Sequence, residues 1–351
     1  METNKEMKLP VYNLDYDLVR TYGKQILAKE KEKRNPQKLK INYVTITPDN
    51  KYVVCGYKSG QIAIFDKETT EAIKYFKAHS GKVQHIEFYQ PDNVMLTCGA
   101  DGKVLIFDLT NFTFIQEIVQ PPIDGHGHLK EIRFALISEG MKHIYFGSQN
   151  GCLYKCDKSN NYKPYVFVNP EDMYPSEPYF LTSGVFSPDK RYLVFTSGYS
   201  IKFVNLETGK VEKKFGDTKH YINDVTFYPN NENIVATWSQ DGTITYWDIQ
   251  SERELISFSA SDDDDGYSHL VFNNSGTYLA SANDGHYVNI WDAVTKHPIA
   301  KIKDKVSMDG MIKAHKKTVK SMIFVDDDEL LTCSFDGTAK YWKLKQLNYE
   351  D

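Results

Sequence analysis

Short stretches in which apolar and polar side chains alternate, or in which apolar ones run together, recur along most of the chain. Val225-Thr226-Phe227 alternates as expected for a strand with one buried face, and residues 192–195 form a continuous apolar run. Turns that contain Pro or Gly separate these stretches, as at Ser187-Pro188-Asp189. The pattern predicts a repeating unit of strand, Pro turn, strand, Gly turn, strand, loop and strand.

An internal repeat organises these units. Seven strands end on an aromatic or apolar residue followed by a polar one: Phe65-Asp66, Phe107-Asp108, Cys156-Asp157, Val204-Asn205, Trp247-Asp248, Trp291-Asp292 and Trp342-Lys343. Successive pairs lie about 42, 49, 48, 43, 44 and 51 residues apart, near the roughly 40–45 residues of a propeller blade. A turn precedes each pair: Ser59-Gly60, Asp101-Gly102, Asn150-Gly151, Tyr199-Ser200, Asp241-Gly242, Asp284-Gly285 and Asp336-Gly337. Because a four-stranded unit cannot bury both its faces alone, the copies must stack, and radial stacking makes a propeller.

The Trp-Asp endings and Asp-Gly turns resemble those of the WD-repeat family over roughly residues 36–348. The resemblance implies an all-β fold, a single seven-bladed β-propeller of four-stranded antiparallel blades. We expect an N-terminal extension over residues 1–35 and a propeller over 36–351. The expected blades are 41–76, 77–118, 125–168, 179–215, 218–258, 263–302 and 312–351. The third and fourth blades depart from the pattern, because Cys156-Asp157 and Val204-Asn205 replace the aromatic-Asp ending.

The last blade lacks room for its outermost strand. In other blades this strand ends about ten residues after the terminal pair, at Phe76 and Ile302 for example. Ten residues beyond Lys343 lies past Asp351, the last residue. The segment 18–27 has the apolar content to supply the missing strand. We therefore expect an N-terminal strand to close the ring and to remove an open sheet edge.

Within a blade, the resemblance implies a hydrogen-bonded tetrad of a loop His, a strand Ser or Thr, the turn Asp and the Trp. Such a network is needed because a buried Asp and a buried indole N–H must each find a partner. The matching residues are His315, Thr332, Asp336 and Trp342 in the seventh blade, His79, Thr97 and Asp101 in the second, Thr237, Asp241 and Trp247 in the fifth, and Ser281, Asp284 and Trp291 in the sixth. Phe107 replaces Trp in the second blade, and His220 of the fifth is displaced by two residues.

These groups also resemble Ser/Thr-His-Asp catalytic triads. The structural interpretation is favoured because the arrangement recurs in several blades, whereas a catalytic site usually occurs once. Thr332 should also lie in mid-strand rather than on the exposed elbow of a nucleophile. The G-x-x-x-x-G-K-[ST], H-E-x-x-H and G-x-S-x-G motifs are absent. The sequence therefore predicts a protein that is not an enzyme and binds no cofactor.

Three groups of potential metal ligands fit a structural interpretation better. Cys152 and Cys156 would lie about 13 Å apart on a strand, which is too far to share one zinc ion. The acidic run 262–265 lacks suitable ligands at the first and last positions of an EF-hand loop. It is expected to be a solvated loop or a charge patch for a basic partner. His126 and His128 have no identifiable further ligands, so no metal site is expected.

Charge and composition narrow the function further. The 351 residues include 42 Lys and Arg against 47 Asp and Glu, a net charge of -5 that makes nucleic-acid binding unlikely. Residues 1–40 carry a net charge of +4, which leaves about -9 for the rest. The sequence has no N-terminal apolar run, no long apolar segment and no disulfide-framework spacing among its five cysteines. We therefore expect no membrane insertion and a cytoplasmic location, with a nuclear, cytoskeletal or ciliary one as alternatives.

The predicted function is a non-catalytic protein-protein interaction scaffold or adaptor, a subunit of a larger assembly that binds other proteins through its propeller loops. Candidate contacts near the starts of first strands or in turns are Lys82, Tyr221, Trp238, Tyr267 and Lys316. Trp238 either packs between blades or anchors a partner, because its neighbour Thr237 should point inward. The alternative is a chromatin- or nucleic-acid-associated propeller whose basic face combines residues 313–320 with the N-terminal connector.

Overall fold

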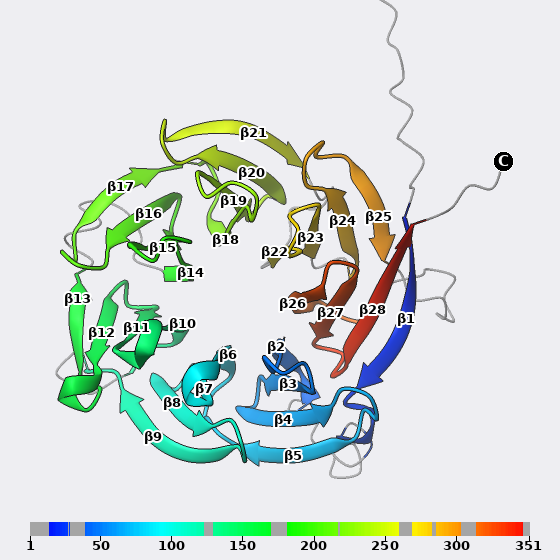
Figure 1. Ribbon diagram of the computed structural model, residues 1–351, viewed down its shortest axis with the longest axis horizontal. Helices are drawn as coiled ribbons and strands as arrows, with labels where there is room; N and C mark the ends of the chain where they lie inside the picture. Colours follow the sequence, from blue (N-terminus) through cyan, green and yellow to red (C-terminus); the bar gives the residue numbers. More distant parts are fainter. Residues whose placement is uncertain are drawn as a thin grey trace, which may run out of the picture.

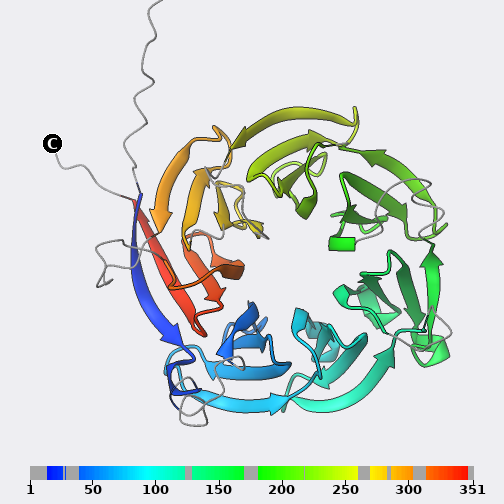
Figure 2. The same cartoon turned by 180° about the vertical axis from the view of Figure 1, so that it is seen from behind.

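The protein folds as a ring of seven β-sheets. The computed structural model describes residues 14–26, 28, 39–122, 129–169, 181–216, 218–259, 269–282, 286–302 and 314–346. The described residues form seven antiparallel sheets of four strands each. Figure 1 shows the sheets as blades around a central axis, and Figure 2 shows the same ring from behind. The predicted all-β, seven-bladed propeller is confirmed.

Each of the first six blades arranges its strands in chain order from the centre outward. Blade 1 contains β2 (Ile41–Ile46), β3 (Tyr52–Tyr57), β4 (Gln61–Asp66) and β5 (Ala72–Lys77). Blade 2 contains β6 (Val83–Tyr89), β7 (Val94–Gly99), β8 (Lys103–Asp108) and β9 (Thr113–Val119). Blade 3 contains β10 (Ile132–Ile137), β11 (His143–Ser148), β12 (Leu153–Asp157) and β13 (Pro164–Val168).

The second half of the ring repeats this order. Blade 4 contains β14 (Leu181–Phe186), β15 (Tyr192–Ser197), β16 (Ser200–Asn205) and β17 (Val211–Phe215). Blade 5 contains β18 (Ile222–Phe227), β19 (Ile234–Ser239), β20 (Thr243–Asp248) and β21 (Arg253–Ser259). Blade 6 contains β22 (Leu270–Phe272), β23 (Tyr278–Ala282), β24 (Val288–Asp292) and β25 (Pro298–Ile302). Three short 3-10 turns, η2 (Gln90–Asp92), η3 (Glu139–Met141) and η4 (Lys158–Asn160), lie between strands, and no helix in the described part of the chain is long and apolar enough to cross a membrane.

Blade 7 is completed by both ends of the chain. Its strands β26 (Val319–Asp326), β27 (Glu329–Ser334) and β28 (Ala339–Gln346) are followed outward by β1 (Leu14–Tyr22), which pairs antiparallel with β28. In Figure 1 the blue β1 lies along the red β28. The predicted closure by an N-terminal strand is confirmed.

The segment predicted to supply this closing strand, residues 18–27, overlaps β1 only over residues 18–22. β1 begins at Leu14 and ends at Tyr22. Gly23, with φ of +88°, and a helical turn at residues 24–26 follow it. A Cβ on Gly23 would lie 2.8 Å from the carbonyl oxygen of Gly337, so the chain turns here in close contact with a turn of blade 7. Tyr22 is fully buried, and its hydroxyl donates to the Lys67 carbonyl at 2.9 Å.

Burial explains why the second strand of each blade is so uniformly apolar. Five of the six residues of β3, β15, β19 and β27 are buried, because each blade is packed between two others. The outermost strands β9 and β21 are mostly exposed. The apolar clusters lie between adjacent blades; one contains Cys98 and Ile106 of blade 2 with Ile144 and Phe146 of blade 3. The core is therefore divided into interfaces between blades.

A bulge at the start of the inner strands positions side chains toward the axis. The pairing with the second strand skips one residue in five of the seven inner strands, and the skipped residues are Asn42, Gln84, Arg133, Asn223 and Lys320. A bulge leaves its extra residue unpaired and redirects its side chain. All five side chains line one cavity at the centre of the ring.

Candidate functional site

One end of the propeller collects several kinds of connection. Each inner strand begins beside the end of its second strand, as shown by the pairing of Ile41 with Tyr57 and of Val319 with Ser334. The segments that lead into the inner strands and the turns between second and third strands therefore share this end. We name it the strand-start face.

The central cavity reaches the strand-start face. It has a volume of about 530 Å³, and its described lining includes four basic side chains, Lys58, Lys82, Arg133 and Lys320, against one carboxylate, Asp224. This concave opening is positively charged, whereas the whole protein has a net charge of -5, so this end differs in charge from the molecule as a whole.

Some of the charged groups at this opening already have partners within the protein. Asp224 accepts hydrogen bonds from Ser183 Oγ at 2.6 Å and from the backbone N–H of Leu270 at 3.0 Å. Glu131 lies 3.1 Å from Lys82 Nζ and 3.6 Å from Arg133 Nη1, so the two cations share its single negative charge.

A histidine of the same lining adds no charge at neutral pH. Burial lowers the pKa of His85 to about 4, and its ring packs edge-on against Tyr43 with centroids 5.0 Å apart. Besides Lys82 and Arg133, which share Glu131, the lining contains the cations Lys58 and Lys320.

These two lysines belong to a cluster around one aromatic ring. The Nζ atoms of Lys40, Lys58 and Lys320 lie 5.4, 5.5 and 5.2 Å from the centroid of the Phe335 ring. Distances below about 6 Å are typical of cation–π contacts. We name these four residues the Phe335–lysine cluster. Lys58 is exposed, whereas Phe335 is half-buried.

Ring closure brings the Phe335–lysine cluster together. Lys40 and Lys58 belong to blade 1, and their backbones are joined by the Lys58 N–H, which donates to the Lys40 carbonyl at 2.7 Å. Lys320 and Phe335 belong to blade 7, and the Phe335 N–H donates to the Thr318 carbonyl at 3.1 Å. The cluster therefore lies across the joint between the first and last blades, which β1 keeps closed.

Three of the predicted partner-binding residues lie on the strand-start face. Lys82 precedes β6 and lines the cavity. Tyr221 precedes β18 and stacks on Tyr199 with ring centroids 4.7 Å apart. Lys316 is exposed in the segment before β26. Tyr267 lies outside the described residues.

Of the two roles predicted for Trp238, the structure supports packing between blades and contradicts a partner anchor. Only 1% of its surface is exposed, and it packs with Tyr246, Phe272 and Trp291 between blades 5 and 6. Its indole N–H is buried without a hydrogen-bond partner among the described residues. Trp238 therefore stabilises the interface between two blades and carries an unsatisfied donor.

Substitutions at Trp238 test this packing role. Trp238→Ala is expected to lower the free energy of unfolding by about 3–5 kcal/mol, because it leaves a large cavity. Trp238→Phe removes the unpaired N–H, which favours folding, and some buried volume, which disfavours it. We therefore expect the free energy of unfolding to change by less than about 1.5 kcal/mol. Urea unfolding of both variants measures this. Equal losses in the two variants would contradict the account.

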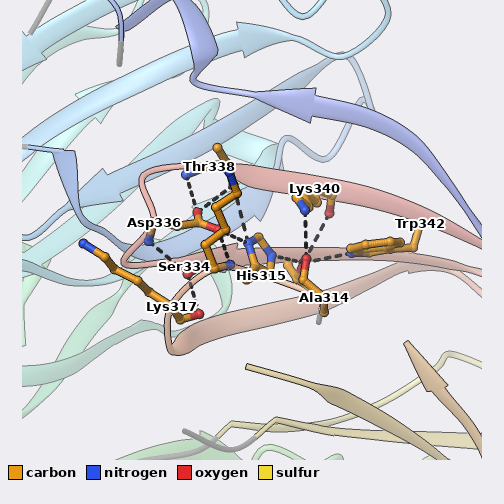
Figure 3. A network of polar contacts seen from close by, with 10 residues as sticks. Ala314, His315, Lys317, Ser334, Asp336, Thr338, Lys340 and Trp342 are labelled. Carbon is orange, nitrogen blue, oxygen red and sulfur yellow. Dashed lines mark hydrogen bonds and ion pairs between the residues drawn. The ribbon is translucent and has the colours of Figure 1, made fainter. Parts of the chain in front are cut away.

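The seventh blade holds a complete tetrad (Figure 3). Trp342 Nε1 donates to Thr332 Oγ1 at 2.9 Å, and Thr332 Oγ1 lies 2.8 Å from His315 Nε2. His315 Nδ1 lies 3.0 Å from Asp336 Oδ2. With the proton of His315 assigned to Nδ1, every donor of the tetrad has an acceptor. The Trp342 indole donates to Thr332, the Thr332 hydroxyl donates to His315 Nε2, and His315 Nδ1 donates to Asp336.

Asp336 is also fixed by the backbone and by a neighbouring hydroxyl. It accepts from the Lys316 N–H at 3.0 Å and from Thr338 Oγ1 at 2.7 Å. Burial alone would raise the pKa of Asp336, but these hydrogen bonds and His315 hold it well below its usual value. Thr332 is fully buried and its hydroxyl is engaged, so the group has the geometry of a structural network rather than of a nucleophile.

The other tetrads are less complete. In blade 2, His79 lies 2.9 Å from both Asp101 Oδ1 and Thr97 Oγ1, and Phe107 provides no donor. In blade 5, Trp247 Nε1 donates to Thr237 Oγ1 at 2.9 Å. There His220 is half exposed and its Nε2 lies 3.8 Å from Asp241 Oδ2, so the displaced histidine makes no hydrogen bond to Asp241. In blade 6, Trp291 Nε1 donates to Ser281 Oγ at 2.9 Å, and Asp284 lies outside the described residues.

Blade 2 offers a test of the missing indole. Phe107→Trp is expected to raise the free energy of unfolding by about 1 kcal/mol, because the new N–H can donate to Thr97 as in the other blades. Phe107 is buried and its ring contacts those of Phe76 and Phe114, so the larger indole requires the exposed Phe114 ring to shift toward the open groove that both residues line. Thermal unfolding measures the gain. The gain should vanish in a Thr97→Val background, and a gain that persists there would exclude the hydrogen bond as its cause.

The candidate metal ligands that the structure describes, Cys152 and Cys156, form no recognisable site. All five cysteines are buried with free thiols, and burial raises the pKa of those of Cys98 and Cys333. No group of three or more potential metal ligands occurs in the parts of the chain that the structure describes. The acidic run 262–265 and residues His126 and His128 lie outside those parts.

Sequence reasoning missed Lys40, Lys58, Arg133 and Phe335. A signal for them existed in the repeat itself. Lys58 and Phe335 both stand immediately before the turn dipeptide of their units, and Lys40 stands immediately before its first strand, as Lys82 does. Comparison of equivalent positions across the seven units would have placed these side chains on one face.

Two family profiles match the chain. The profile described as "WD domain, G-beta repeat" matches residues 209–248, 253–292 and 307–343. The profile described as "Anaphase-promoting complex subunit 4 WD40 domain" matches residues 13–91. The matched segments include the closing strand and most of blades 1, 5, 6 and 7.

Several curated proteins are similar to parts of the chain. Protein LST8 homolog of Drosophila melanogaster is 24% identical over 233 residues, which are 61% of this chain and 68% of that protein. Pre-mRNA-processing factor 19 of Oryza sativa subsp. japonica is 23% identical over 283 residues, 79% of this chain and 50% of that protein. WD repeat-containing protein 91 of Danio rerio is 26% identical over 138 residues, 35% of this chain. The chain matches only 19% of that last relative's length.

Proposed function

Because the chain belongs to the WD-repeat β-propeller family, we propose that it is a non-catalytic protein-protein interaction scaffold that docks partner proteins on its strand-start face. The observation that carries this proposal is the Phe335–lysine cluster at the mouth of the central cavity. It combines three cations and an aromatic ring on a closed ring of sheets. Aromatic and cationic side chains on a rigid scaffold are typical of binding surfaces.

The tetrads support a scaffold rather than an enzyme. They recur in several blades, and the hydroxyl of Thr332 is fully buried and hydrogen-bonded to His315. The tetrads hold turns and strands in place. The tetrad of blade 7 also fixes the segment that leads into β26, because Asp336 accepts a hydrogen bond from the Lys316 N–H. The networks thus serve to keep the strand-start face rigid.

Charge reversal on the strand-start face tests the proposal. Lys40→Glu/Lys58→Glu is expected to lose the proteins that the wild-type chain recovers by affinity purification and mass spectrometry. The matched control is Lys51→Glu/Lys158→Glu, which changes the net charge by the same amount at the opposite end of the propeller. Lys51 lies between β2 and β3, and Lys158 directly follows β12. Recovery of the same proteins by both variants would overturn docking on the strand-start face.

A further inference from the structure

The Phe335–lysine cluster also indicates the chemistry of the partner. We propose that it binds an extended, carboxylate-rich segment of a partner protein, with an apolar side chain of that segment against the Phe335 ring. This inference rests on the proposed docking function and adds the class of ligand. The cluster is distinguished by three features: two lysines, Lys40 and Lys58, without ion pairs among the described residues, short spacing between the ammonium groups, and a central apolar surface.

Two lysines of the cluster, Lys40 and Lys58, lack a local counter-charge in the described part of the chain. Among the described residues, no ion pair involves Lys40 or Lys58, whereas Lys82 and Arg133 share Glu131. The nearest turn carboxylate, Asp336, is occupied by His315 and by the Lys316 N–H. Cations gathered without counter-charges repel one another, so an anionic ligand relieves that repulsion when it binds.

The spacing of the lysines fits carboxylates on one extended chain. Two ammonium groups that lie 5.4 and 5.5 Å from the same ring centroid are no more than 10.9 Å apart. Side chains at positions i and i+2 of an extended segment project to one side about 7 Å apart. Two acidic residues in that pattern therefore reach two lysines at once.

The half-buried ring provides a second contact. Phe335 lies between the lysines and lines the cavity, so an apolar side chain in the segment can pack on it while the acidic ones meet the ammonium groups. Elsewhere in the lining of the same cavity, Arg133 Nε is a buried donor without a hydrogen-bond partner in the described part of the chain. A carboxylate or backbone carbonyl that enters the cavity would satisfy that donor.

A nucleic acid fits the same surface less well. Binding of a phosphodiester backbone requires cations along several successive phosphates, whereas in the rest of the cavity lining Asp224 and the pairing of Lys82 and Arg133 with Glu131 reduce the positive charge. Single-strand binding also uses several stacking aromatics, and Phe335 is the one ring around which these lysines gather. The observations therefore favour an acidic peptide.

The test measures binding of a defined probe by fluorescence anisotropy. The probe is a labelled ten-residue peptide of alternating Asp and Ala with one central Phe, at low salt. We expect saturable binding that weakens with added salt, and that falls at least tenfold with Lys40→Gln/Lys58→Gln. The peptide with Asn in place of Asp should not bind, and Lys51→Gln/Lys158→Gln should bind as wild type does. Unchanged melting temperatures establish that both variants are folded.

Other outcomes overturn the inference in distinct ways. If a labelled twenty-residue oligothymidine binds more tightly than the acidic peptide and loses affinity in Lys40→Gln/Lys58→Gln, the ligand is a nucleic acid. If neither probe binds while the Lys40→Glu/Lys58→Glu variant still loses its partners, the acidic class is wrong and the docking function stands. If that variant keeps its partners, the docking function itself fails.

Discussion

Deletion of residues 1–22 is expected to convert the chain into an aggregating protein with a much lower melting temperature. β1 pairs with β28 from Leu14 opposite Gln346 to Tyr22 opposite Ala339, and it joins the two ends of the ring. Its loss exposes the whole edge of β28, and an exposed edge is a template for pairing with other chains. It also removes the fully buried Tyr22 from the interface with blade 1.

Thermal unfolding and size-exclusion chromatography measure this effect. The matched control is deletion of residues 1–12, which leaves β1 intact and should change neither readout. Tyr22→Ala is a milder version, expected to cost about 3–5 kcal/mol because it empties a large buried site. A monomeric 1–22 deletion that melts at the wild-type temperature would contradict closure by β1.

Asp336→Ala is expected to lower the free energy of unfolding by about 3 kcal/mol. The substitution leaves His315, the Lys316 N–H and the Thr338 hydroxyl without their shared acceptor, and buried donors that lose a charged acceptor are costly. Asp241→Ala in blade 5 is the matched control, expected to cost less than about 1 kcal/mol. Asp241 hydrogen-bonds the Thr243 N–H and lies beyond hydrogen-bond distance of His220. Equal costs for the two substitutions, measured by urea unfolding, would contradict this ranking.

The same carboxylate predicts a pH dependence. The pKa of Asp336 is lower in the folded chain than in the unfolded one, so its contribution to stability is complete above the unfolded value of about 3.9. That contribution is lost as the pH falls below this value toward the folded pKa. The difference in free energy of unfolding between the wild type and Asp336→Ala should therefore narrow between pH 5 and pH 2. A difference that does not change over this range would exclude the charged Asp336 as the source of the stabilisation.

The repeat made most of the fold predictable from the sequence. Turns and strand endings recur at nearly constant spacing, so the all-β propeller of seven blades followed from arithmetic on residue positions. The position of the closing strand was predicted from the apolar content of residues 18–27, and the alternation of apolar and acidic residues in Leu14-Asp15-Tyr16-Asp17-Leu18 was given no weight. That alternation is typical of an edge strand with one face buried, and Tyr16 does pack against Trp342.

The site was harder to predict, for two physical reasons. Thr237 and Trp238 are adjacent in β19, so their side chains point to opposite faces, yet both are buried because a blade stands on each side. Alternation along the strand therefore does not mark an exposed residue. The Phe335–lysine cluster brings residues 40 and 335 together only when the ring closes, and no local pattern encodes that contact.

Zero-length carbodiimide cross-linking of the chain with its captured partner tests the central claim most directly, because it joins lysine amines to carboxylates that are in contact. Docking of an acidic segment on the Phe335–lysine cluster predicts links from Lys40, Lys58 or Lys320 to Asp or Glu residues of one partner segment, and their absence in Lys40→Gln/Lys58→Gln. Links confined to lysines at the opposite end, such as Lys51 and Lys158, would contradict docking of an acidic partner on the strand-start face.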